Sequence, residues 1–107
     1  MYYPLPAAII ECLILAIVKE QDSYGYEISQ TIKLASAIKE STLYPILKKL
    51  EQNGYLTTYS QEINNRTRKY YHITDSGLVR LDFLGREWQE YSRTIDGIIE
   101  GRIRHEQ

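Results

Sequence analysis

The sequence STLYPILKKLEQNG, residues 41–54, predicts the helix around which the rest of the chain is organised. Its apolar side chains recur at the i, i+3, i+4, i+7 spacing of one buried helix face: Leu43, Ile46, Leu47 and Leu50. A proline deep inside a helix removes a backbone hydrogen bond, so Pro45 makes Ser41 or Thr42 the expected N-cap. Gly54 suits the left-handed residue that follows a helix, and the helix is therefore expected to span residues 41–53.

The opposite face of this helix suits a polyanion. Ser41 and Thr42 offer hydroxyls and free amides at the helix start, where the macrodipole favours negative charge. The side chains that point away from the leucines are Tyr44, Lys48, Lys49 and Gln52. An ordinary amphipathic helix with a solvated polar face has the same pattern, so the neighbouring segments must decide between the two interpretations.

Composition predicts one folded domain without a strongly basic surface. The chain has 107 residues, of which 43% are apolar and 25% charged, and its net charge is −1. Residues 33–49 hold four lysines and one glutamate, and Arg66, Arg68 and Lys69 fall within four residues without an acid among them. From Thr74 onward, seven acids stand against five arginines. The cations that could meet a polyanion therefore lie in the middle of the chain.

The N-terminal sequence and the cysteine count favour a cytoplasmic protein. The apolar run in residues 1–20 is interrupted by Glu11, has no basic segment before it and is too short to span a membrane. Cys12 is the single cysteine, so no disulfide can form within one chain. Its side chain is expected to be a small buried apolar group.

Two helices are expected before the central one. The first covers residues 5–19, with Pro4 and Pro6 at its start. Its nearly continuous apolar sequence implies burial against a second subunit as well as the core, through side chains such as Ile9 and Leu13. The second helix is expected from residue 24 to about 36.

Some features of the second helix indicate packing in the core, and Tyr26 allows contact with a phosphate as well. Asp22 or Ser23 is its expected N-cap, and its inward stripe is Ile28, Ile32 and Ala35. Gly25, a poor helix former, predicts close approach of another backbone. Tyr26 either donates its hydroxyl to a phosphate or completes the core. A tight turn between this helix and the next is typical of a helix-turn-helix.

Residues 55–73 predict a β-hairpin with a cationic tip. Residues 55–63 are rich in β-forming residues, and Asn64, Asn65 and Arg66 form a turn that tolerates positive φ. In TRKYYHI, alternation places Arg68, Tyr70 and His72 on one face and Lys69, Tyr71 and Ile73 on the other. A hairpin directly after a helix-turn-helix is the winged-helix order. Arg66, Arg68 and Lys69 then reach DNA, unless they form a solvated loop.

The last helix carries a seam for a partner. Thr74 is its expected N-cap, with Asp75 in the first turn. Apolar residues recur in steps of three and four over about two and a half heptads: Leu81, Leu84, Trp88, Tyr91, Ile95 and Ile98. Gly97 and Gly101 weaken the last turns. The seam predicts dimerisation through this helix.

Three fragments together resemble the PadR family of bacterial winged-helix transcription regulators. They are YGYEI at residues 24–28, STLYPILKKLEQNGYL at residues 41–56, and RKYYHIT at residues 68–74 with Gly77 after it. The single helix after the hairpin resembles the short subclass of that family. The resemblance implies a mainly α fold with a β-hairpin wing: a winged helix-turn-helix in residues 1–74 and a long C-terminal dimerisation helix in residues 75–107.

The resemblance also implies a function. Family members are homodimeric repressors that bind an inverted repeat in double-stranded DNA and are released by a small molecule or another signal. Ser41, Thr42, Tyr44 and Lys48 match recognition-helix positions, and Arg68 and Lys69 match the wing. Some short members bind flat aromatic compounds at the dimer centre beside a tryptophan, which implies a ligand role for Trp88 with Tyr91 nearby, or else a packed seam. Tyr24 stands where many members carry histidine.

Two other classes of function remain for comparison. A winged-helix dimer that senses a ligand or binds a protein, without binding DNA, has the same core pattern. An enzyme is not expected, because His72 and His105 have no cysteine, serine or carboxylate at a catalytic or metal-binding spacing. The sequence contains no glycine-rich phosphate loop and no cysteine pair for zinc, so neither a cofactor nor a metal is expected.

Overall fold

Four helices and a three-stranded antiparallel sheet make up the part of the chain that this computed structural model describes, residues 4–106. The elements are α1 (Ala7–Glu20), β1 (Ser23–Tyr24), α2 (Gly25–Ile32), α3 (Glu40–Gln52), β2 (Leu56–Ile63), β3 (Arg66–Ile73) and α4 (Asp75–Ile99). The strand order is β1-β3-β2. This confirms the predicted winged helix-turn-helix with a long C-terminal helix, although the expected domains also include residues 1–3 and 107, outside the described residues.

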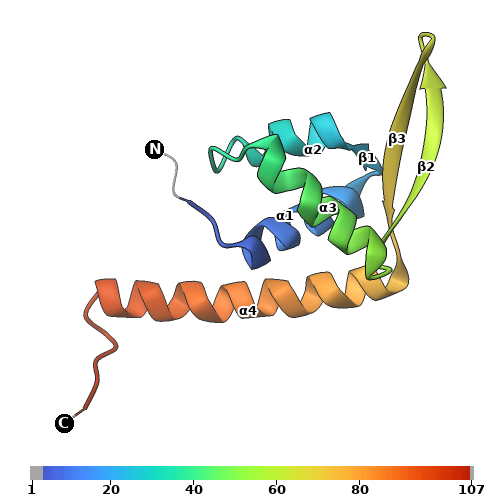
Figure 1. Ribbon diagram of the computed structural model, residues 1–107. Helices are drawn as coiled ribbons and strands as arrows, with labels where there is room; N and C mark the ends of the chain where they lie inside the picture. Colours follow the sequence, from blue (N-terminus) through green and yellow to red (C-terminus); the bar gives the residue numbers. More distant parts are fainter. Residues whose placement is uncertain (1–3, 107) are drawn as a thin grey trace.

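The elements form a small helical body with two projections (Figure 1). Helices α1, α2 and α3 pack together, the β2–β3 hairpin extends from one end, and α4 runs along α1 and past it. The described chain measures 64 × 31 × 21 Å, so it is strongly elongated. A long exposed helix on a small body leaves much apolar surface without a partner in the same chain.

The core is built by the predicted apolar stripe of α3. Leu43, Leu47 and Leu50 are fully buried, and Ile46 is half-buried at the edge of the same face. They pack with the inward residues of α1 and α2, which are Ile10, Ile14, Leu15, Val18, Ile28 and Ile32. Burial of a leucine or isoleucine side chain contributes about 1.5–3 kcal/mol, so this stripe fixes the position of α3.

The start of α3 differs from the prediction. The N-cap is Lys39 rather than Ser41 or Thr42, and no side chain caps it by a hydrogen bond. Pro45 consequently lies inside the helix, in its second turn. The amides of Thr42 and Leu43 both donate to the Lys39 carbonyl, at 2.9 and 3.0 Å, so the helix is capped two residues before Ser41.

The end of α3 confirms the predicted glycine cap. Gly54 has φ +78°, and its amide donates to the Glu51 carbonyl while the Tyr55 amide donates to the Leu50 carbonyl, each at 3.0 Å. This pair of bonds is the Schellman motif, which satisfies carbonyls that the helix leaves free. It also turns the chain directly into β2.

The second helix is shorter than predicted. Ser23 and Tyr24 form β1, which pairs with Tyr71 and Tyr70 of β3, and α2 then begins at Gly25. The predicted caps are wrong, because the N-cap is Tyr24 and the Ser23 hydroxyl donates to Glu27 at 2.6 Å. The helix ends at Ile32, so two corrections follow at its far end: residues 33–35 form a turn, and Ala35 is exposed. The first helix likewise begins at Ala7, with Pro6 as its N-cap.

The hairpin and the last helix follow the prediction closely. Asn64 and Asn65 have φ of 53° and 64°, which is the geometry of a tight two-residue hairpin turn, and Arg66 already belongs to β3. The Thr74 hydroxyl accepts a hydrogen bond from the Gly77 amide at 3.0 Å and so caps α4. The predicted alternation in β3 is also confirmed, since Tyr71 and Ile73 are buried and His72 is exposed.

Candidate nucleic-acid interface

The outer face of α3 presents the predicted polar residues. Ser41, Thr42, Tyr44, Lys48, Lys49 and Gln52 are all exposed. Within the described residues, neither Lys48 nor Lys49 makes an ion pair. Their charges are therefore available to a polyanion along the last turns of the helix.

The N-terminus of α3 does not offer the free anion site that its sequence predicted. Glu40, the first residue of the helix, has its pKa lowered chiefly by its own backbone amide and then by Lys33, whose Nζ lies 3.1 Å from Glu40 Oε1. The carboxylate thus occupies the position that the helix dipole favours for a negative charge. Any anion that meets this surface must therefore be held by other cations, and the hydroxyls of Ser41 and Thr42 are exposed beside Glu40.

Tyr44 connects α3 to α2. A Cβ placed on Gly25 would lie 2.9 Å from Tyr44 Cε1 and 3.1 Å from its hydroxyl oxygen. The predicted approach of another backbone at Gly25 is therefore wrong, because the group that lies close to it is the side chain of Tyr44 on α3. Tyr26, in the same turn of α2, is 64% exposed, which excludes the interpretation that it completes the core.

Arg68 and Lys69, two neighbouring cations of β3, make different contacts: one with an aromatic ring and the other with a carboxylate. Lys69 pairs with Glu51 of α3 at 3.2 Å, and the Glu51 bond is the main reason that the pKa of Lys69 is raised. Arg68, on the other strand face, has its guanidinium carbon 4.4 Å from the centre of the Tyr24 ring. Arg68 has no carboxylate partner in the part of the chain that the structure describes, whereas the ion pair of Lys69 with Glu51 joins the hairpin to α3.

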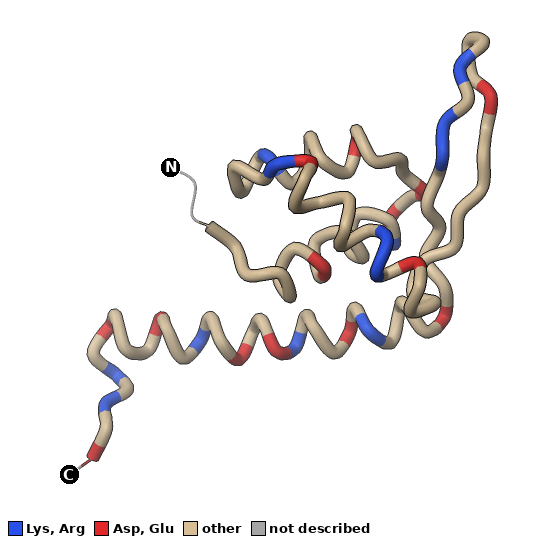
Figure 2. Tube along the Cα trace, in the orientation of Figure 1, with Lys and Arg blue, Asp and Glu red and all other residues tan. Residues whose placement is uncertain are grey.

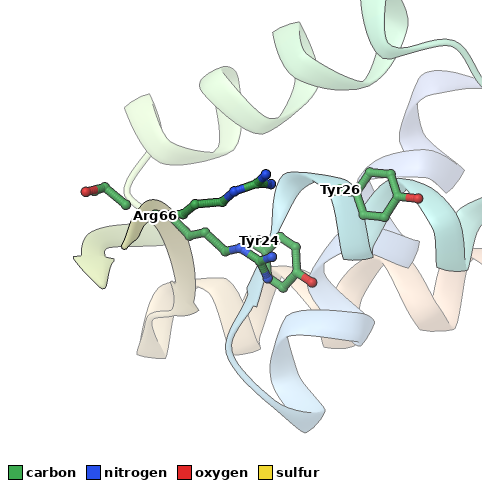
Figure 3. Close-up of a pocket in the computed structure, with 5 residues that line it drawn as sticks. Tyr24, Tyr26 and Arg66 are labelled. Carbon is green, nitrogen blue, oxygen red and sulfur yellow. The ribbon is translucent and has the colours of Figure 1, made fainter. Parts of the chain in front are cut away.

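Arg66 and Arg68 line a cavity of about 450 Å³ between the hairpin and the start of α2. Its other walls are Tyr24, Tyr26 and Thr67. Figure 3 shows Arg66 extending from the hairpin toward α2, with Tyr24 and Tyr26 on the α2 side. Sequence reasoning missed Tyr24, because its place in the wall depends on the pairing of β1 with β3 and not on a local pattern.

Asp22 ties the base of the hairpin to the helical body. Its carboxylate accepts hydrogen bonds from Tyr59 at 2.7 Å and contacts His72 Nδ1 at 2.8 Å. Burial acts to raise the pKa of Asp22, but the bonds from His72 and Tyr59 outweigh it, so the net shift is downward. The same contact raises the pKa of Tyr59. His72 is thus an exposed strand residue, as expected, with a structural partner.

On β3 the basic residues have no acids among them, while α3 and α4 each carry both signs along their length (Figure 2). The structure brings together the predicted Tyr26, Tyr44, Arg68 and Lys69 around one surface, since all four line a neighbouring hollow with Tyr24, Gly25 and Tyr71. Lys48 and Lys49 lie further along α3. This arrangement of a helix beside a cationic hairpin has the shape needed to follow a nucleic-acid backbone.

A second surface, on α4, is apolar. Trp88, Tyr91 and Ile98 of the predicted seam are 43%, 56% and 58% exposed, and Ile95 is exposed beside them. Leu84, by contrast, is buried in the chain's own core, and Leu81, Ile9 and Leu13 are half-buried against α1 or α4. The first two seam residues, Leu81 and Leu84, are therefore packed within the chain. The remaining four, Trp88, Tyr91, Ile95 and Ile98, form the open half of the seam.

Trp88 and Tyr91 also line a hollow of about 360 Å³ between α1 and α4. The other lining residues are Pro6, Ala8, Ile9, Leu84 and Glu87. The two rings lie 6.1 Å apart and are tilted by 48°. A mostly apolar hollow with aromatic walls is the usual environment for a flat organic ligand.

Other kinds of site find no support among residues 4–106. No group of three or more His, Cys, Asp and Glu side chains is placed to hold a metal ion there. In that same range, none of the helices has the length and apolar character that a bilayer span requires. Burial, and after it the charge of Glu11, raises the pKa of the Cys12 thiol.

Comparison with known proteins identifies one family. The sequence profile of the transcriptional regulator PadR-like family matches residues 14–82 of this chain. An uncharacterized protein of Lysinibacillus sphaericus is 38% identical over 97 residues, which cover 86% of this chain and 89% of that protein.

Solved structures with the same fold cover most of the chain. The protein smu.1704 of Streptococcus mutans is 68% identical, with a TM-score of 0.94 over 99% of this chain and 100% of that one. A PadR family transcription regulator of Clostridium difficile is 30% identical, with a TM-score of 0.76 over 84% of this chain and 97% of its own. A PadR-like transcriptional regulator of Bacillus cereus is 29% identical, with a TM-score of 0.77 over 85% and 91% of the two chains.

Proposed function

Since the chain belongs to the PadR-like family of transcriptional regulators, we propose that it is a homodimeric repressor that binds an inverted repeat and is released by a small-molecule or stress signal. PadR-like regulators bind DNA and dimerise, and they are not enzymes. The single observation that carries the proposal for this chain is the group of cations on α3 and β3 that form no ion pair within residues 4–106, which are Lys48, Lys49, Arg66 and Arg68. Such a regulator acts where the chromosome is, in the cytoplasm.

The two parts of the interface have different roles in this proposal. Lys48, Lys49, Arg66 and Arg68 contact phosphates and supply most of the affinity, which makes binding strongly dependent on salt. Ser41, Thr42 and Tyr44 face the base edges in the major groove and contribute to the choice of sequence. Lys69 has a smaller part, because contact with a phosphate must compete with Glu51.

The dimer is proposed to form through residues 75–107, with residues 1–74 as the DNA-binding domain. The open half of the α4 seam, Trp88, Tyr91, Ile95 and Ile98, supports this proposal, because exposed apolar surface of this kind needs a partner. Ile9 and Leu13 of α1 extend the surface, whereas Leu81 and Leu84 contribute mainly to the fold of each protomer. Two copies related by a twofold axis present their α3 helices to half-sites about 34 Å apart.

The test is the pair of substitutions Lys48→Ala and Arg68→Ala, measured on operator DNA selected from the source genome. Each lost phosphate contact reduces the slope of log K against log salt by about 0.9, so loss of four contacts in the dimer reduces it by about 3–4. The matched control is Lys19→Ala with Arg93→Ala, two exposed cations on α1 and α4. Unchanged affinity in the first pair, with the dimer intact, refutes the proposed DNA interface.

The hollow beside Trp88 favours a second element of the proposal, a planar aromatic effector bound at the dimer centre. Titration with planar aromatic dyes is expected to quench Trp88 fluorescence and to release the protein from DNA. Quenching without any DNA binding by the free protein supports the alternative, a winged-helix module that only senses its ligand. If the dyes cause neither quenching nor release, the ligand role of Trp88 and Tyr91 is rejected.

Regulation by repression is tested separately from binding. In a reporter strain, deletion of the gene is expected to raise expression from the bound promoter, and expression of the Lys48→Ala, Arg68→Ala variant is expected to leave it raised. Lower expression after deletion assigns an activator instead.

A further inference from the structure

Three tyrosines form a row across the sheet at the base of the hairpin. Tyr24 of β1 and Tyr59 of β2 each pair with Tyr70 of the central strand β3. The Tyr24 and Tyr70 rings meet edge to face at 5.5 Å, and the Tyr59 and Tyr70 rings stack at 5.6 Å. Such ring pairs stabilise each other beyond the burial of their area, so the row holds its rings in fixed positions.

The row is anchored at both ends. The Tyr59 hydroxyl donates to Asp22 at 2.7 Å, and Asp22 lies two residues before Tyr24 in the chain. The segment after α1 thus contains Tyr24, the first ring of the row, and through Asp22 it also binds Tyr59, the last ring. This closed arrangement restrains the Tyr24 ring although β1 has only two residues.

Arg68 contacts the ring of Tyr24, at one end of this row. It lies two residues before Tyr70 on β3, hence on the same strand face, and its guanidinium carbon is 4.4 Å from the Tyr24 ring centre. A cation within about 6 Å of a ring centre is attracted by the ring's negative face. Unlike the carboxylate that holds Lys69, an aromatic ring fixes a cation without cancelling its charge.

We propose that Tyr24 is a positioning residue that holds Arg68 so that, together with Arg66, it receives one backbone phosphate of the operator in the cavity between the hairpin and α2. This inference rests on the proposed DNA binding. The cavity of about 450 Å³ is lined by two guanidinium groups, two tyrosines and Thr67, and by no carboxylate. Its chemistry suits a singly charged phosphodiester flanked by an apolar sugar, for which the rings of Tyr24 and Tyr26 provide walls.

A series of substitutions at Tyr24 tests the role of its ring. Tyr24→Phe keeps the ring and binds operator DNA as the wild type does. Tyr24→Leu removes it and weakens binding by about threefold in each protomer, or about tenfold in the dimer. In the double variant Tyr24→Leu, Arg68→Gln, binding is no weaker than in Arg68→Gln alone, because Tyr24 acts through Arg68.

Ethylation of single DNA phosphates provides a readout that a purely structural role does not change. We expect one phosphate whose ethylation blocks the wild type and Tyr24→Phe but has no effect on Tyr24→Leu or Arg68→Gln. Additive losses in the double variant, or an unchanged ethylation pattern in Tyr24→Leu, overturn the positioning role.

Two controls separate this inference from folding and from the proposed function. If Tyr24→Leu unfolds, fluorinated phenylalanines at position 24 keep the shape and weaken the ring's negative face stepwise, and affinity is expected to fall with each added fluorine. Affinity that does not change along this series overturns the inference. Failure of the wild type to bind any genomic DNA refutes the proposed function, and with it the premise of this inference.

Discussion

Gly77→Ala tests how α4 is joined to the winged helix. A Cβ on Gly77 would lie 2.2 Å from the Tyr55 carbonyl oxygen and 2.7 Å from Ile73 Cγ1. The first of these atoms belongs to the backbone and accepts the Thr74 amide at 3.1 Å, so it cannot rotate away. The start of α4 must move until the contact opens from 2.2 Å to at least 3.0 Å.

The cost of this movement follows from the contacts that it disturbs. Overpacking of a rigid site costs about 1–3 kcal/mol, and the clash with backbone favours the upper half of that range. The Thr74 cap on the Gly77 amide, 3.0 Å long, is strained as well, at about 1 kcal/mol. Alanine regains about 1 kcal/mol of helix propensity over glycine. The expected net loss is about 2–3 kcal/mol, equivalent to a decrease in Tm of about 10–15 °C.

Gly85→Ala is the matched control, because it makes the same change on the same helix where nothing lies within 4 Å of the new Cβ. It is expected to stabilise the protein by up to about 1 kcal/mol. Both variants and the wild type are compared by thermal and urea unfolding at one protomer concentration, since dimer stability depends on concentration. A Gly77→Ala variant that melts at or above the wild type refutes the packing argument.

Three further predictions concern pH, the approach of α3 to α2, and the thiol. Because the folded pKa of Asp22 is lowered, its bonds to His72 and Tyr59 stabilise the protein fully above the ordinary carboxyl pKa of about 4. That stability is lost as pH falls through the lower folded value, so urea unfolding of Asp22→Asn and wild type should converge in acid. Gly25→Ala displaces the end of the Tyr44 ring, which can move, so DNA affinity measured by fluorescence anisotropy should fall while the melting temperature changes little. Cys12, with its raised pKa, should react slowly with Ellman's reagent at pH 8 and rapidly once urea has unfolded the protein.

Much of the fold is predictable because it rests on local patterns. The buried stripe of α3, the glycine after it, the two-asparagine turn and the Thr74 cap each depend on residues within one or two turns of each other. Period, cap chemistry and turn chemistry are encoded at that range. These patterns also predicted the winged-helix order of the elements, and the family resemblance added the expected function.

The features that sequence reasoning missed depend on contacts between distant segments. A strand of two residues has no period, so β1 exists only because β3, more than forty residues later, pairs with it. Glu51 and Lys69 are 18 positions apart, and no local rule assigns one as the partner of the other. The start of α3 was mispredicted because its N-cap is Lys39, two residues before Ser41, and Lys39 has no capping side chain that would mark the helix start in the sequence.

Net charge says little about this interface, because charges act over a short distance in salt. At physiological ionic strength an exposed charge is screened beyond about 8 Å, so a DNA phosphate responds to its immediate neighbours rather than to the sum over the chain. Several cations are already compensated, as in the pairs Arg86–Asp82 and Arg102–Glu100 on and after α4. The cations without a carboxylate partner that remain on α3 and β3 therefore set the local field, although the whole chain carries a charge of −1. A substitution that changes the net charge on α4 should accordingly affect DNA affinity far less than the removal of one guanidinium from β3.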